Sequence, residues 1–427
     1  MRKKQNEYYD VAVIGGGPAG MMTAAIAAEN GLKVILLEKN DSLGNKLRIT
    51  GGGRCNITNA TFDYKKFLEK FPEAKKFLYS PFSKFSVKDT FEFFEKNGLE
   101  LVTEARNRVF PKSQKAIDVV KTLIKKIRKN KVEVLTRAEV VDLRRTGDGS
   151  NKIEALLLKD GRRIFAKNFV IATGGVASPK TGSTGDGFRW LKKLGLKVKK
   201  PNPNIVPLKT DSKIFHSISG TAWNNAGVKF LLNGKTKIKK TGRILFTHFG
   251  LSAPLILNSA YEVKKLLAQG RVEVVLDLFP DLDEAKLDKK ILKLFEENKN
   301  KILKNVLPEL LQKKLSEAVL TYSKLGIANK KVNEITKDER KNLVRILKNI
   351  RMTITGTLGM ERAVIADGGL ELDEVDTKTM KVKGWDNLYV VGDVLNINRP
   401  SGGYSLQLCW TTGFVVADAL KNMVEKK

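Results

Sequence analysis

The first forty residues alternate between short apolar runs and a glycine-rich turn. Val11 to Ile14 and Val34 to Leu37 are uninterrupted apolar runs, which are typical of strands buried on both faces. Between them, residues 21–29 are rich in alanine and favour a helix, which Asn30-Gly31 ends. The pattern therefore predicts a strand, a turn, a helix and a second strand at the N-terminus.

Strand-like runs return in the first half of the chain. Residues 131–145 and 152–175 contain alternating and apolar β-type runs, and Lys159-Asp160-Gly161 marks a turn inside the second stretch. That stretch ends in Thr173-Gly174-Gly175. We expect this glycine-permitted turn beside the carboxyl edge of the sheet.

A cluster of proline and asparagine at residues 199–209 marks a domain boundary. Short β-type runs dominate from about 206 to 280, and residues 282–350 are helical in pattern. Thr336 and Glu339 form a capping box at the start of one of these helices.

Strand and glycine signals resume near the C-terminus. A strand ends at Val391, Gly392-Asp393 form a turn, and residues 411–420 suit a helix. The middle of the chain therefore has the pattern of an insertion into an α/β domain, with boundaries near 205 and 350.

The turn after the first strand carries a G-x-G-x-x-G motif. Gly15 permits the tight turn, Gly17 lets the backbone approach a pyrophosphate, and Gly20 lets helix and strand pack closely. The helix N-terminus offers unpaired N–H groups to the phosphates. Glu38, which ends the second strand, is placed to accept hydrogen bonds from ribose hydroxyls and disfavours a phosphorylated ribose.

Composition excludes several classes of protein. The chain has 427 residues, 42% of them hydrophobic, and no apolar run approaches the roughly 18 residues of a membrane span. Cys55 and Cys409 are the two cysteines, so we expect neither a disulfide framework nor a metal site, and a reducing cytoplasm as the location. The Asn56-Ile57-Thr58 sequon is then incidental.

The net charge of +32, from 78 basic and 46 acidic residues, attracts anionic partners. Residues 112–131 carry eight of the basic residues, with Ile117, Val120, Ile124 and Ile127 among them at helical spacing. This pattern is typical of a helix with a solvated lysine face. A lysine-rich surface is the first interpretation of the charge, and a polyanionic partner is the alternative.

Motifs at the N-terminus, in the middle and near the C-terminus of the chain resemble those of flavoproteins with a two-dinucleotide-binding fold. These motifs are GGGPAG, LLEK, ATGG and LYVVGD. Five longer stretches are similar to one bacterial family of FAD-dependent oxidoreductases, which includes aminoacetone-oxidase-like and bile-acid-reductase-like proteins; they are residues 44–59, 108–120, 172–188, 246–257 and 401–413.

The resemblance implies a fold and a cofactor. It implies a Rossmann-like FAD-binding domain formed by residues 1–204 and 351–427, an inserted β-barrel-like domain at 205–281 and an inserted helical domain at 282–350. The sequence departs from the family pattern at Gly392-Asp393, where Gly-Glu is usual, at residues 396–398, and at residues 379–383. These departures put the substrate in more doubt than the cofactor.

The resemblance and the motifs together give a set of candidate residues. His248, in the insert, and Tyr404 are the candidate proton donors or substrate contacts, whereas His216 is expected to be structural. Arg54 is the preferred cation for a phosphate or for the flavin. Cys55 is interpreted as a packing residue, with a reactive thiol as the alternative. The expected FAD contacts are Gly15, Gly17, Pro18, Ala19, Gly20, Glu38, Lys39, Lys46, Gly52, Gly53, Arg54, Cys55, Asn56, Val140, Thr173, Gly174, Gly175, Gly392, Asp393, Gly402, Gly403, Tyr404, Ser405 and Leu406.

The expected function is that of an FAD-dependent oxidoreductase acting on a small or medium organic substrate. Hydride exchange at flavin N5 leaves negative charge near N1 and C2=O, which backbone N–H groups at the start of the last helix could stabilise. No second G-x-G-x-x-G unit follows a strand, so NAD(P)H would bind only transiently. Two alternatives are a flavin-dependent RNA-binding or RNA-modifying protein and a non-catalytic flavin sensor.

Overall fold

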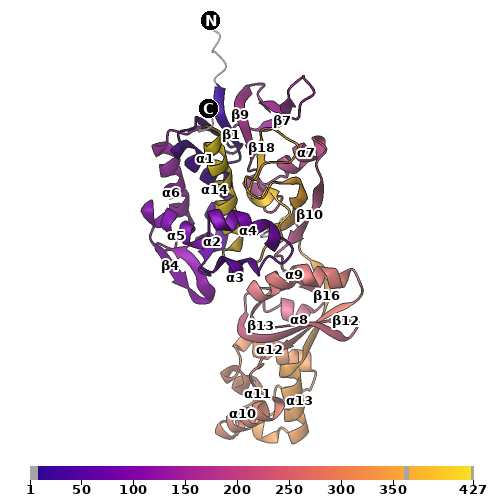
Figure 1. Ribbon diagram of the computed structural model, residues 1–427. Helices are drawn as coiled ribbons and strands as arrows, with labels where there is room; N and C mark the ends of the chain where they lie inside the picture. Colours follow the sequence, from indigo (N-terminus) through magenta and orange to yellow (C-terminus); the bar gives the residue numbers. More distant parts are fainter. Residues whose placement is uncertain (1–7, 360–364, 425–427) are drawn as a thin grey trace. The chain divides into compact units, whose positions relative to one another are not determined.

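The structure is a computed structural model that describes residues 8–359 and 365–424. It divides into two compact units (Figure 1). The first unit comprises the chain up to Pro203 and from Val364 onward, and the second comprises Asn204–Ala363.

The first unit contains a seven-stranded sheet in the order β6-β2-β1-β9-β8-β7, and β18 also pairs with β9. Strands β6, β2, β1, β9 and β18 are parallel, whereas β8 and β7 are antiparallel. A three-stranded sheet, β3-β5-β4, and a pair, β10-β17, complete its β-structure. The strands are β1 (Tyr8–Ile14), β2 (Val34–Leu37), β3 (Thr58–Asn59), β4 (Leu101–Glu104), β5 (Arg108–Pro111), β6 (Glu133–Leu135), β7 (Val140–Arg145), β8 (Ile153–Leu158), β9 (Arg163–Ile171), β10 (Val198–Asn204), β17 (Ile365–Leu370) and β18 (Leu388–Val390).

Helices cover this sheet, and α1 and α14 pack on one another (Figure 1). Residues 19–27 of α1 are buried, which explains why its sequence is alanine-rich on every side rather than amphipathic. The helices are α1 (Pro18–Glu29), α2 (Asn45–Gly53), α3 (Tyr64–Leu68), α4 (Lys75–Lys84), α5 (Val87–Lys96), α6 (Ala116–Lys129), α7 (Asp186–Lys193) and α14 (Tyr404–Val424).

The expected strand–helix–strand unit is present at the N-terminus. Strand β2 spans the four residues that the pattern indicated, and β1 begins three residues earlier than the apolar run. β1 pairs in parallel with β2 on one side and with β9 on the other. The Rossmann-type fold expected from the sequence is therefore confirmed.

The second unit contains a closed barrel in the order β11-β14-β13-β12-β15-β16, together with helices that follow it in sequence. Its strands are β11 (Leu208–Thr210), β12 (Ala222–Leu232), β13 (Lys235–Thr247), β14 (Gly250–Ser252), β15 (Val272–Asp277) and β16 (Ile350–Thr357). Its helices are α8 (Lys213–His216), α9 (Pro254–Leu267), α10 (Glu284–Glu297), α11 (Leu303–Val306), α12 (Lys313–Ser323) and α13 (Lys337–Lys348).

Strand β16 lies on the other side of the expected domain boundary. Residues from 351 onward were expected in the FAD-binding domain, but β16 pairs with β11 and β15 and closes the barrel. The boundary between the two compact units consequently lies after residue 363. This closure pairs Leu208 with Thr357, 149 positions later in the chain, which periodicity within a short window cannot reveal.

The helix ends agree with local capping chemistry. Thr336 and Glu339 form the expected capping box at the start of α13. Within the described ranges, 8–359 and 365–424, no helix is long and apolar enough to cross a membrane.

Candidate functional site

The turn after β1 is tight because two of its glycines lie against backbone atoms. Gly15 has a φ of +109°, and a Cβ there would lie 2.5 Å from the carbonyl oxygen of Ala172. A Cβ on Gly20 would lie 1.9 Å from the carbonyl oxygen of Gly15. Gly17 differs, because it is the N-cap of α1 with a φ of −77° and a Cβ there would have no described atom within 4 Å. Gly15 and Gly20 serve the fold, whereas Gly17 keeps space open at the helix N-terminus.

Glu38 holds this turn from the end of β2 and is buried. Its Oε2 accepts a hydrogen bond from the amide of Gly16 at 2.8 Å. Its Oε1 accepts from the amide and the side-chain nitrogen of Asn40 at 2.8 and 2.7 Å. A carboxylate offers about four lone-pair positions, so Oε2 keeps one acceptor position for a further donor.

Three segments far apart in sequence converge at the carboxyl ends of β1, β9 and β18. A Cβ on Gly392 would lie 3.0 Å from the Cβ of Ala19, and one on Gly175 would lie 3.4 Å from the carbonyl oxygen of Asp393. Nζ of Lys46, on α2, lies 3.4 Å from Oδ2 of Asp393. This edge of a parallel sheet is where α/β folds bind their ligands.

A buried arginine holds Asp393. The side chain of Arg399 pairs with Oδ1 of Asp393, and it also donates to the carbonyl oxygens of Ile397 at 2.8 Å and Leu395 at 3.1 Å. Burial alone raises the pKa of Asp393, but the charges of Arg399 and Lys46 outweigh burial and lower the pKa to about 2. Asp393 is therefore a carboxylate at neutral pH.

Arg399 was not among the residues predicted from the sequence. It lies in "NINRPSGG", where proline and glycine mark a turn. No local signal distinguishes an arginine inside a buried turn from one on an exposed turn. Its burial (1% exposed) follows from long-range packing.

The segment 44–59 starts as α2 and turns back through three glycines. Gly51, Gly52 and Gly53 have φ values of 58°, 69° and 83°, and a Cβ on either Gly52 or Gly53 would have no described atom within 4 Å. The Nε atoms of Arg48 and Arg54 are buried and have no hydrogen-bond partner among the described residues. Because a buried donor without an acceptor is costly, both groups favour an acceptor from outside the chain.

Two of the candidate cations have carboxylate partners within the protein. Arg54 lies 2.6 Å from Oε1 of Glu104, and its guanidinium lies over the ring of Phe110 at 3.9 Å. Nζ of Lys39 lies 2.7 Å from Oδ2 of Asp186, at the start of α7. Arg54 retains the free Nε described above, whereas the ammonium group of Lys39 is directed to α7.

Cys55 is fully buried beside the glycines. Burial raises the pKa of its thiol to about 12, although a hydrogen bond with Thr50 opposes the shift. The thiolate is therefore negligible at neutral pH, which favours the interpretation of Cys55 as a packing residue. The neighbouring Asn56 accepts a hydrogen bond from the amide of Val109 at 3.2 Å and so fixes the segment to β5.

Helix α14 begins at Tyr404, seven residues before the expected helix at 411. Gly402 and Gly403 precede it with φ values of 112° and 97°, and a Cβ on Gly403 would lie 2.2 Å from the carbonyl oxygen of Thr58. Ser405 and Leu406 thus belong to the first helical turn, whose N–H groups lack intrahelical acceptors. The early start was missed because this helix is buried over most of its surface and has no polar stripe.

The Tyr404 ring packs within an aromatic cluster. Its centroid lies 4.8 Å from that of Phe67 and 6.0 Å from that of Phe71. Burial raises the pKa of the Tyr404 phenol, although a hydrogen bond with Thr61 opposes the shift. Tyr404 therefore remains protonated at neutral pH and is a hydrogen-bond donor.

The remaining candidates lie in three different settings. His248 is exposed in the turn between β13 and β14, with its ring 4.8 Å from that of Phe249. Val140 is buried at the start of β7. Thr173 follows β9 and has a buried Oγ1 with no partner among the described residues, and a Cβ on Gly187 would lie 2.5 Å from that oxygen.

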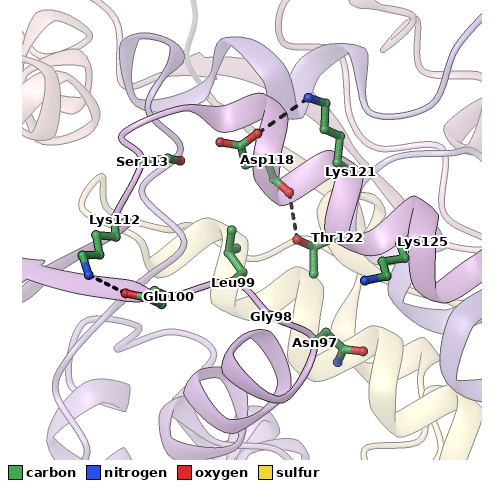
Figure 2. Close-up of a pocket in the computed structure, with 10 residues that line it drawn as sticks. All are labelled: Asn97, Gly98, Leu99, Glu100, Lys112, Ser113, Asp118, Lys121, Thr122 and Lys125. Carbon is green, nitrogen blue, oxygen red and sulfur yellow. Dashed lines mark hydrogen bonds and ion pairs between the residues drawn. The ribbon is translucent and has the colours of Figure 1, made fainter.

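A separate hollow of about 570 Å³ lies between α6 and the β4–β5 region (Figure 2). Four of its five charged residues are paired within the chain, Lys112 with Glu100 at 2.6 Å and Lys121 with Asp118 at 3.9 Å. None of its ten lining residues belongs to the candidate set. We therefore place the candidate site at the sheet edge and not in this hollow.

Comparisons with known proteins agree with this geometry. The HI0933-like protein Rossmann domain family matches residues 9–419. A 3-dehydro-bile acid delta(4,6)-reductase from Clostridium scindens is 28% identical over 413 residues, covering 96% of this chain and 98% of its own. A ribosomal RNA dihydrouridine synthase from Escherichia coli is 26% identical, covering 97% and 98%. A 3-ketosteroid-delta4-(5alpha)-dehydrogenase structure from Rhodococcus jostii RHA1 has a TM-score of 0.54 at 14% identity, covering 99% of this chain and 98% of its own, and supports the fold.

The chain belongs to the HI0933-like protein Rossmann domain family, and this is a family of FAD-dependent oxidoreductases. The residues fit FAD on two observations. The space beside Gly17 lies at the N-terminus of α1, and the free Nε groups of Arg48 and Arg54 lie beside the exposed glycines of segment 44–59.

Proposed function

We propose that this member of the HI0933-like protein Rossmann domain family is an FAD-dependent reductase that uses NAD(P)H to reduce a small or medium organic substrate. FAD, when bound, supplies hydride transfer at N5. The observation that carries the proposal is that the glycine turn held by Glu38 meets the Gly392-Asp393 turn, since a Cβ on Gly392 would lie 3.0 Å from the Cβ of Ala19.

The chain's own residues would hold the cofactor by charge and hydrogen bonding. The N-terminus of α1, kept open by Gly17, would bind the phosphates through N–H groups. The spare acceptor position of Glu38 would receive a ribose hydroxyl. Asp393, kept ionised by Arg399 and Lys46, would accept a hydrogen bond from a hydroxyl of the sugar-alcohol chain.

The reduced ring would be stabilised from the start of α14. Its first-turn N–H groups, including those of Ser405 and Leu406, have no intrahelical acceptors and carry the positive end of the helix dipole. Arg54 adds a cation whose Nε is free of partners among the described residues. Both features favour a ring that carries negative charge.

His248 and Tyr404 are the proposed proton donors to the substrate. The imidazole of His248 is exposed, and its ring nitrogens can serve as hydrogen-bond donor and acceptor. Replacing His248 with glutamine should lower the rate of substrate reduction by about 10²-fold while leaving FAD content unchanged. The matched control is His216→Gln, since Nε2 of His216 lies 3.1 Å from Oγ1 of Thr210 within the second unit.

The test of the proposal is anaerobic mixing with NADH or NADPH while flavin absorbance is recorded. Bleaching by one nucleotide, followed by reoxidation on adding an organic acceptor, is the expected result. A flavin that is bleached only by dithionite or light would contradict the proposal and would favour a sensor.

A second candidate is an RNA-modifying reductase. Two relatives that match nearly the full chain, from Escherichia coli and Haemophilus influenzae, are ribosomal RNA dihydrouridine synthases at 26% and 27% identity. The net charge of +32 favours the same class of substrate. Reoxidation of the reduced flavin by RNA, but not by organic acceptors, would select this candidate.

A further inference from the structure

Strands β12 and β13 are labelled in Figure 1 and form a hairpin, residues 222–247. The charged residues of this hairpin are all of one sign. It contains no acidic residue, and its basic residues are Lys229, Lys235, Lys237, Lys239, Lys240 and Arg243. The hairpin turns at Asn233-Gly234, whose φ values of 47° and 79° suit a two-residue turn of type I′. The two strands are 11 and 13 residues long.

The basic side chains gather on the outer face of the barrel. Ile244 and Phe246 of β13 point into the barrel core and are fully buried, whereas Lys237, Lys239 and Arg243 are exposed. Alternate residues of a strand lie about 6.7 Å apart on one face. Lys237 and Lys239 are therefore spaced like neighbouring phosphates of an extended nucleic-acid strand, and Arg243 lies two such steps further along the same face.

The strand register places like charges opposite one another. Lys229 of β12 pairs directly with Lys239 of β13. On the far side, Lys229 is opposite Val275 of β15, and Val275 is in turn opposite Arg351 of β16. Like charges at directly opposite positions of a sheet destabilise it, so the fold retains this row at a cost.

Three cations on the outer face have no carboxylate partner within the described part of the chain. Lys240, which points away from the row, pairs with Glu262 of α9. Lys229, Lys239 and Arg243, by contrast, form no ion pair among residues 8–359 and 365–424. The outer face therefore retains its full positive charge for an external anion.

We propose that the outer face of the β12–β13 hairpin binds the phosphate backbone of RNA. This inference rests on the second candidate of the proposed function and gives it a docking surface within the second unit. Contacts of this kind are independent of base sequence and weaken steeply as salt rises. The row would hold RNA as a strand and would leave base recognition to other residues.

The test uses the full-length FAD-loaded protein and a short fluorescein-labelled single-stranded RNA of mixed sequence. The hairpin variant Lys229→Gln/Lys237→Gln/Lys239→Gln is compared with wild type by fluorescence anisotropy across a salt series. The control variant, Lys121→Gln/Lys125→Gln/Lys129→Gln, removes the same charge from exposed positions on α6.

With about 0.7 released counterions per phosphate contact on single strands, loss of three contacts should make the salt slope shallower by about 2 and weaken binding roughly 10- to 100-fold at about 0.1 M salt. The control should retain a slope close to that of wild type. Because the hairpin variant removes a repulsive pair, its thermal unfolding midpoint should be equal to or higher than that of wild type.

Equal losses in both variants would overturn the inference, because the general positive field would then account for binding. An unchanged affinity of the hairpin variant would overturn it as well. The inference would also be overturned if the hairpin variant lost binding to phosphatidylglycerol vesicles but kept its binding to RNA. Bleaching of the flavin by NAD(P)H without RNA is measured in parallel, so that failure of the docking surface and failure of the reductase proposal are told apart.

Discussion

Replacing Arg399 with methionine should be among the most destabilising single changes in the first unit. The guanidinium group is buried, pairs with Asp393 and donates to two backbone carbonyl oxygens. Methionine leaves all three acceptors without this partner and Asp393 with Lys46 alone at 3.4 Å. Removing one partner of a buried ion pair costs about 3–5 kcal/mol.

The pKa of Asp393 reports the net effect of burial, Arg399 and Lys46 on this carboxylate. The pKa of Asp393 is lowered from 3.8 to about 2, which corresponds to about 2 kcal/mol at roughly 1.4 kcal/mol per pKa unit. Because the folded-state pKa is the lower one, this stabilisation is present above about pH 4 and is lost as the pH falls toward 2. The truncation cost is larger because it also includes the two orphaned carbonyl groups.

The assay is urea unfolding of FAD-free protein at neutral pH, with Arg162→Met as the control. Arg162 pairs with Asp160 at 2.7 Å, but both side chains are about half exposed, so the control should cost at most about 1 kcal/mol. Asp393→Asn, alone and combined with Arg399→Met, completes a cycle whose coupling free energy should exceed about 1 kcal/mol. A loss below 1 kcal/mol for Arg399→Met would refute this account of the buried pair.

Three further predictions concern other parts of the chain. Gly20→Ala should lower the free energy of unfolding by about 1–3 kcal/mol through overpacking, because a Cβ there would lie 1.9 Å from the carbonyl oxygen of Gly15; urea unfolding measures this, and an unchanged midpoint would contradict it. Cys55 and Cys409 are buried, and the pKa of each thiol is raised, so a thiol reagent should modify neither in native protein at pH 8 and both after denaturation. Mass spectrometry measures the modification, and rapid labelling of either cysteine in the native protein would contradict the prediction. Thr336→Ala should lower the free energy of unfolding by about 1 kcal/mol, because it removes the cap of α13. Circular dichroism on heating measures this, and an unfolding midpoint equal to that of wild type would contradict it.

Local signals in the sequence were sufficient for the glycine-rich edge of the first unit. The spacing of Gly15, Gly17 and Gly20 between an apolar strand and a helix was enough to predict the turn, because this spacing is itself a local pattern of the sequence. Glu38 followed from its place at the end of the next strand. The structure then assigned different tasks to the three glycines, since only Gly17 has open space beside it.

Long-range contacts account for what the sequence did not reveal. Closure of the barrel by β16 depends on pairing with β11, far away in the chain. The burial of Arg399 has no local signal in the sequence. The early start of α14 was hidden because a helix buried over most of its surface lacks the polar face by which helices are recognised.

The most direct test of the central claim is the FAD content of purified wild-type protein beside Gly17→Val. Wild type should release one FAD per chain on denaturation, whereas the variant should fold normally and release almost none, because the new side chain would fill the space at the N-terminus of α1. Gly147→Val is the matched control, since a Cβ there also meets no described atom within 4 Å, and it should keep its FAD. A folded Gly17→Val that retains FAD at wild-type affinity, or a wild type that stays colourless after incubation with FAD, would contradict the account.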